Sequence, residues 1–169
     1  MTPSTAMERR VKISAGLVFL GLLIALRQGD WSFAILETIH IIGLSASVGL
    51  IMWIDLRLLG RIMVHTSVAR VVKMLEPWAI IGFSIMFISG FLLLLSEPLK
   101  CYTTIAFRIK VVMLILAGIN VWYFHSRLSK HMTEWETGDG VPWRAKMVGL
   151  FSLILWFGII IAGRWTAYF

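Results

Sequence analysis

The sequence predicts an all-α integral membrane bundle with four strong transmembrane helices and a short fifth helix at the N-terminus. Hydrophobic residues make up 59% of the 169 residues, charged residues make up only 15%, and the hydrophobic residues lie in long runs that contain few charges. Soluble domains are nearer to about 45–50% apolar. The length favours one domain, so we expect residues 1–169 to form a single membrane domain.

Each of the four strong runs is close to the roughly 20 helical residues that cross a bilayer. These runs are residues 33–57, 77–96, 105–126 and 147–165. We expect Pro77 in the first turn of the second run, where its missing N–H costs nothing. The N-terminal run, residues 12–27, is shorter, because about 15 apolar residues rise only about 22 Å. It either spans the bilayer or lies partly in the interface.

The net charge of +7 indicates membrane topology rather than nucleic-acid binding, because the sixteen Lys and Arg residues lie mostly beside the spans. Basic residues gather in segments 57–73 and 127–146, and the positive-inside rule places both segments in the cytoplasm. If residues 12–27 span, the chain has five spans, with the N-terminus inside and the C-terminus outside. Four spans plus an interfacial helix is the alternative topology.

His40 is the first candidate functional residue, because an ionisable group inside a span indicates function by default. It lies about two turns into the run 33–57, and at 100° per residue Gly43 and Ser47 share its face. The small residues either admit a neighbouring helix, with His40 hydrogen-bonded across the interface, or leave room for a flat macrocycle. In the second case a neutral imidazole would ligate iron.

Lys110 is expected at the same depth as His40, one to two turns from the outer side. It either extends to the interface along its own methylene chain or serves as a neutral amine, as a second metal ligand or as an acid/base group. Arg27, Arg108 and Arg164 are expected near the outer interface as well. They either anchor the helices or hold the carboxylates of a bound cofactor.

The other polar groups are expected at the cytoplasmic ends of the spans. We expect Asp55 and Arg57 to form an ion pair that fixes the depth of the helix, with proton entry or contact with a redox partner as the alternative role. His125 is expected to be solvated at the interface, with a pairing to His65 as the alternative. Cys101 is the only cysteine, so neither an intrachain disulfide nor a cysteine-based metal motif can form.

Two resemblances arise from these residues. The stretch ETIHIIGLSASVGLIMWIDLRLLG, residues 37–60, resembles the hallmark of a family of small bacterial membrane proteins, in which Glu-Thr-x-His precedes Asp-Leu-Arg-Leu-Leu-Gly. The resemblance covers most of the chain, including FRIK and AGIN in residues 105–126. It implies a multi-pass protein of the bacterial cytoplasmic (inner) membrane and says little about activity.

The layout is also distantly similar to the HemJ-type protoporphyrinogen oxidases, small helical membrane proteins that bind haem b. The corresponding residues are His40, Gly49, Arg57 and Lys110. The residues beside the arginine depart from that family's aromatic ones, and the next histidine, His65, is out of register. The resemblance therefore implies haem binding more than it implies that particular oxidation.

These observations together predict a b-type haem protein of the lipid bilayer, with His40 and Lys110 as metal ligands. It would transfer electrons or carry out a porphyrinogen-type oxidation, with a quinone or a redox protein as partner. Whether it is an enzyme and whether it forms a homo-oligomer are left open. The alternative is a non-enzymatic anchor or assembly subunit of a larger complex. A copper-handling or small-molecule transport protein is less favoured, because inverted repeats and broken helices are absent from the sequence.

Overall fold

The computed structural model describes residues 30–96, 103–136 and 140–168, and within them the chain is helical, without strands. The four long helices are α2 (Asp30–Leu58), α3 (Val68–Ser96), α5 (Ile105–Tyr123) and α6 (Trp143–Tyr168). Each lies in a segment that is long and apolar enough to cross a membrane, which confirms the four strong spans and indicates a multi-pass membrane protein. The expected helix at 12–27, and Arg27 beside it, lie outside the described residues.

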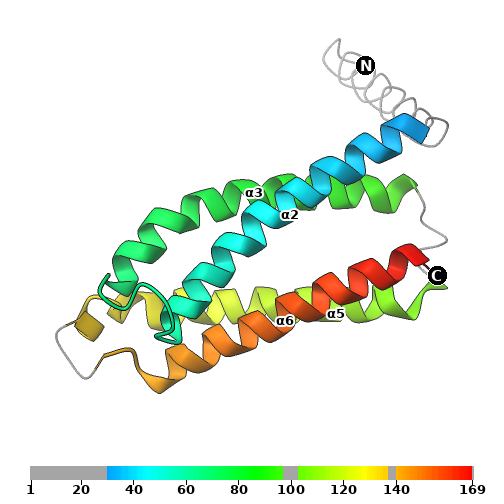
Figure 1. The fold of residues 1–169 in the computed structure, drawn as a ribbon. Coiled ribbons are helices and arrows are strands. Elements are labelled where there is room, and N and C mark those ends of the chain that lie inside the picture. Colours follow the sequence, from blue (N-terminus) through cyan, green and yellow to red (C-terminus); the bar gives the residue numbers. More distant parts are fainter. Residues whose placement is uncertain (1–29, 97–102, 137–139, 169) are drawn as a thin grey trace, which may run out of the picture.

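The four helices form two hairpins that meet along α2 and α6. In Figure 1, α2 runs beside α3, and α6 runs beside α5. Helix α2 also packs against α6, whereas α3 and α5 are not among the closely packed pairs. The loop after α2 and the segment between α5 and α6 lie at one end of the bundle (Figure 1). We call this the basic end, because it carries most of the Lys and Arg residues of segments 57–73 and 127–146.

Glycine sets how closely the two hairpins approach at the basic end. A Cβ atom on Gly149 of α6 would lie 3.0 Å from the backbone oxygen of Asp55 and 3.2 Å from the Cβ of Leu58, both on α2. Valine and alanine side chains from α3 and α6 surround the fully buried Leu58 in a small apolar core. The absence of a side chain at position 149 therefore brings α6 against the polar residue Asp55.

Helix α3 begins earlier than the sequence analysis predicted. It starts at Val68 rather than at residue 77, so Pro77 lies inside the helix instead of in its first turn. The additional turns bury Val68, Val71 and Val72, whereas Arg70 and Lys73 are exposed. Burial of the valines on one face stabilises the additional helical turns. This stabilisation offsets the cost of the backbone hydrogen bond that Pro77 cannot donate.

Helix α5 changes its winding as it ends. After Tyr123 the chain continues as the π-helix η1 (Phe124–Leu128) and the 3-10 turn η2 (Ser129–His131), and a second 3-10 turn, η3 (Glu134–Glu136), follows. The wider π turn buries Phe124 in the apolar core of the basic end and directs His125 toward α3. Short π segments occur often at functional sites.

Candidate functional site

His40 is held by α3 through one of its two ring nitrogens. Its Nδ1 lies 2.9 Å from the backbone oxygen of Met86 and 3.1 Å from the Oγ of Ser89. A carbonyl oxygen can only accept, so Nδ1 carries the proton and donates it. The Ser89 hydroxyl donates in turn to the carbonyl of Ile85 at 2.7 Å, and its oxygen can also accept from His40. The other nitrogen, Nε2, therefore has the lone pair, and it makes no hydrogen bond within the described part of the chain.

Gly90 makes the space in which the imidazole lies. A Cβ atom at this position would come within 2.9 Å of the Cε1 of His40 and within 3.3 Å of its Nδ1. The ring thus packs directly on the backbone of α3 and is half-buried. Sequence reasoning did not identify Ser89 or Gly90 as partners of His40, although the Ser-Gly pair was a visible signal in this span.

Gly43 and Ser47 face α3 at close range. A Cβ on Gly43 would lie 2.9 Å from the backbone nitrogen of Met86, and one on Gly82 would lie 2.8 Å from the backbone nitrogen of Ser47. Ser47 is fully buried, and its hydroxyl donates to the carbonyl of Gly43 at 2.8 Å. Of the two uses considered for this pair, the structure shows the close approach of a neighbouring helix.

Lys110 lies in the second hairpin, toward the same end of the bundle as His40 (Figure 1). It is partly buried on α5 and extends along α6, where a Cβ on Gly163 would lie 3.3 Å from its Nζ. Arg108 and Arg164 are exposed near the start of α5 and the end of α6, at the end of the bundle opposite the basic end.

The donor set around His40 limits which metal centre could form. Among the described residues, no group of three or more His, Cys, Asp and Glu side chains comes together as a metal site. A metal ion held by protein ligands alone takes at least three of them in ordinary catalytic and structural sites. A haem iron needs only one or two, because the macrocycle supplies the others.

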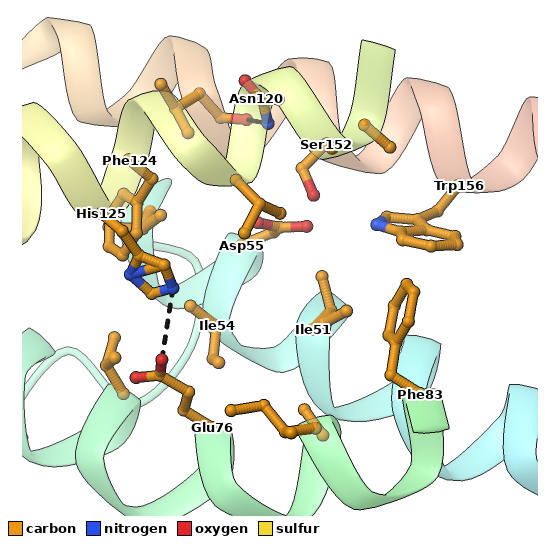
Figure 2. A pocket seen from close by; sticks show the side chains of 18 of the residues that line it. Ile51, Ile54, Asp55, Glu76, Phe83, Asn120, Phe124, His125, Ser152 and Trp156 are labelled. Carbon is orange, nitrogen blue, oxygen red and sulfur yellow. Dashed lines mark hydrogen bonds and ion pairs between the residues drawn. The ribbon is translucent and has the colours of Figure 1, made fainter. Parts of the chain in front are cut away.

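The expected ion pair between Asp55 and Arg57 is wrong. Asp55 is 4% exposed and lies beside the hydroxyl of Ser152 on α6, and both residues line the same cavity (Figure 2). Arg57 points the other way, and its Nε donates to the backbone oxygen of Thr66 at 2.8 Å. Two residues apart on a helix, side chains diverge by about 200°, so one neighbouring helix cannot hold both.

His125 has a partner that the sequence did not indicate. Its Nε2 lies 3.2 Å from the Oε1 of Glu76 on α3, and both side chains are partly exposed. Figure 2 shows this pair beside a cavity near the basic end, with Asp55, Ser152 and Trp156 on the far side. The pairing depends on the early start of α3 and on the π turn η1, and neither was predicted.

Comparisons with known proteins identify a family whose function is unknown. The sequence matches a protein family described as a family of unknown function (DUF6644) over residues 14–169. No curated protein matches it, and no solved structure matches it.

Proposed function

We propose that this chain, which belongs to the DUF6644 family, is a b-type haem-binding membrane protein that transfers electrons, with His40 as a ligand of the haem iron. The observation that carries the proposal is the orientation of the imidazole. Its Nδ1–H is engaged by the Met86 carbonyl, and its Nε2 lone pair has no protein partner among the described residues. Histidines that bind metals typically donate their other N–H to a carbonyl or carboxylate, which fixes the ring and raises its basicity.

The surrounding groups fit a cofactor with carboxylate side chains. Arg108 and Arg164 lie at the same end of the bundle as His40, and guanidinium groups match carboxylates in geometry and charge. We propose that they, with Arg27, hold the propionates, and that Lys110 is the second ligand or the neighbouring acid/base group. Gly43 and Ser47 support the site indirectly, because their packing on α3 holds α2 in register.

When bound, the haem would supply reversible one-electron chemistry. The protein would hold it, exclude water and set the charge around it. Simple electron transfer is our first proposal. Oxidation of a porphyrinogen, with its electrons passed to a quinone or a redox protein, is the more specific form of the same proposal. We further propose that the basic end faces the cytoplasm of a bacterial inner membrane, with the N-terminus inside and the C-terminus outside.

An absorbance spectrum of the detergent-purified protein tests the proposal. Cells are supplied with haem during expression, and the bound haem is quantified as its pyridine haemochrome. We expect a Soret band in the unaltered protein, loss of that band in His40→Ala, and an unchanged band in His65→Ala, which alters an exposed loop histidine. Imidazole added to His40→Ala should restore absorbance if the variant is folded. A protein without a Soret band under these conditions would refute the proposal.

Lys110→Leu, which cannot ligate iron, separates the two roles proposed for the lysine. If its amine ligates the iron, this variant keeps haem but shifts the Soret band, because the axial ligand is lost. If the amine acts only as a neighbouring base, the spectrum stays unchanged and electron transfer slows. A variant that keeps both the spectrum and the rate would remove Lys110 from the proposal.

One observation favours a second candidate, a non-enzymatic anchor or assembly subunit. His40 already has a structural task, because it joins α2 to α3 beside the close contact between Gly43 and Gly82. In this case the protein purifies without a cofactor. His40→Ala would then lower its stability without changing what associates with it.

A further inference from the structure

A second part of the bundle has the features of a ligand-binding site. A cavity of about 720 Å³ lies between the two hairpins toward the basic end, and all four long helices line it. Small-molecule sites usually have volumes of about 300–1,000 Å³. His40 and Lys110 do not line it, so this cavity is separate from the proposed haem site and does not depend on it.

The wall of the cavity is mainly aromatic and aliphatic. The ring of Phe83 stacks on that of Phe87 with centroids 5.4 Å apart, and it meets the indole of Trp156 edge-on at 5.2 Å. Phe124 lines the cavity toward the basic end. A flat ring would extend this set of stacked and edge-on contacts, since aromatic pairs favour both arrangements.

Asp55 places an unpaired polar atom in this apolar surrounding. The residue is 4% exposed, and its Oδ2 is buried without a hydrogen-bond partner in the described structure, although Ser152 lies beside the carboxyl group. No ion pair to Asp55 is formed among the described residues. Burying a polar group without a hydrogen-bond partner costs free energy, so folded proteins rarely contain such groups.

Trp156 places a second unpaired atom beside the first. Its side chain is 1% exposed, and its Nε1–H is the other buried side-chain polar group without a partner in the described residues. Figure 2 shows the indole nitrogen directed toward the Asp55 carboxyl group, across the space next to Ser152. One donor and one acceptor thus face the same region of the cavity.

We propose that this cavity binds a lipid-soluble aromatic alcohol, a phenol or a quinol, with its hydroxyl group between Asp55 and Trp156. A hydroxyl oxygen accepts from the Trp156 N–H while its hydrogen is donated to Asp55 Oδ2. An ammonium group offers Trp156 no acceptor, and an ether offers the carboxylate no donor. The aromatic ring would then lie against Phe83 and Phe87.

Access to the cavity is from the side of the bundle. Its rim includes the exposed residues Ile80 and Phe87 on α3 and Val121 on α5, and these two helices are not closely packed on each other. All three residues lie within the membrane-spanning segments. A ligand dissolved in the lipid would therefore reach the cavity without crossing the aqueous phase.

Fluorine NMR titrations of the detergent-solubilised full chain test the proposal with matched probes. The probes are 4-fluorophenol, 4-fluoroanisole, fluorohydroquinone and (4-fluorobenzyl)trimethylammonium, each corrected for its partition into empty micelles. We expect 4-fluorophenol to bind about tenfold more tightly than 4-fluoroanisole, because only the phenol can donate to the buried carboxyl group. Fluorohydroquinone that binds more tightly than 4-fluorophenol would indicate a quinol, and equal binding would indicate a monophenol.

Substitutions test whether Asp55 Oδ2 and Trp156 Nε1 cause the preference for the phenol over the anisole. We expect Asp55→Leu and Trp156→Phe each to reduce the ratio of phenol to anisole affinity toward one. Ser84→Ala is the control, because Ser84 also lines the cavity but its hydroxyl already donates to the carbonyl of Ile80 at 2.9 Å. If Asp55→Leu does not fold, Asp55→Asn replaces it, and its weaker acceptor should lower the ratio partially.

Four outcomes would overturn the proposal. The first is equal affinity for the phenol and the anisole in the unaltered protein. The second is tighter binding of the ammonium probe, which would indicate an organic-cation site instead. The third is an unchanged phenol preference in a folded Asp55 variant. The fourth is the absence of any saturable binding.

Discussion

The backbone of Gly82 on α3 lies directly against Ser47 on α2, so that a Cβ atom on Gly82 would come within 2.8 Å of the Ser47 nitrogen. Real Cβ atoms essentially never approach backbone atoms this closely. Gly82→Ala must therefore push the two helices apart, and we expect it to lower the free energy of unfolding by about 1–3 kcal/mol. Denaturant unfolding in micelles, followed by circular dichroism, measures this change.

Gly49→Ala is the matched control for that variant. Gly49 lies on α2, and a Cβ atom there would meet nothing within 4 Å. Alanine is favoured over glycine inside a helix by about 0.5–1 kcal/mol, so this variant should be as stable as the unaltered protein or more stable. Equal losses in both variants would contradict the role of Gly82 in helix contact.

Gly90→Ala should displace the imidazole of His40. A Cβ atom at this position would lie 2.9 Å from the Cε1 of His40, and the ring cannot turn away without losing its hydrogen bond to Met86. If His40 holds haem, the haem bound per protein should fall, or the Soret band should shift. Absorbance per protein measures both, with Gly118→Ala as the control because its Cβ would meet no atom within 4 Å. Identical spectra in the two variants would argue against iron ligation by His40.

Trp156→Ala should be strongly destabilising. The indole is 1% exposed, lies in a buried cluster with Val48, Ala117 and Ile159, and meets Phe83 edge-on. Truncating a buried aromatic side chain to alanine costs about 3–5 kcal/mol. Trp122→Ala removes an indole that is 68% exposed, and it should cost far less. The difference between the two unfolding free energies is the test, and similar values would show that Trp156 is not part of the packed core.

Arg57→Met should loosen the loop between α2 and α3. The guanidinium of Arg57 is buried and ties this loop to α2 by donating from Nε to the carbonyl of Thr66 at 2.8 Å. Its loss leaves that carbonyl unpaired, so trypsin should cut after the exposed Arg61 several-fold faster. Arg70→Met changes an exposed arginine on α3 and should leave the cleavage rate unchanged. Equal cleavage rates in the unaltered protein and both variants would contradict a role of the Arg57–Thr66 hydrogen bond in holding the loop.

The four spans could be predicted from the sequence because the bilayer imposes a simple requirement of length and hydropathy. The start of α3 could not be predicted in the same way. Residues 68–76 combine buried valines with exposed Lys73, and this pattern serves a protein interface rather than lipid. A prediction from hydropathy assigns such an extension to a loop. Pro77 supports the same wrong assignment, because proline is common in the first turn of a helix.

The polar groups show where sequence reasoning stops. His40 and Lys110 were identified because charge is unusual at membrane depth. Their contacts with Ser89, Gly90 and Gly163 depend on the rotation of one helix against the next, and spacing along a single helix does not contain that information. The same holds for the pairing of His125 with Glu76 and for the turn of Asp55 away from Arg57.

The separation of α3 from α5 changes how the strength of binding in the cavity should be judged. A compound that enters from the lipid is present there at its membrane concentration, and partitioning can raise this far above its concentration in water. A weak intrinsic affinity is then enough for high occupancy. Bilayer lipids and detergent tails would compete for the same space, so the affinity measured for a ligand should depend on the composition of the surrounding membrane or micelle.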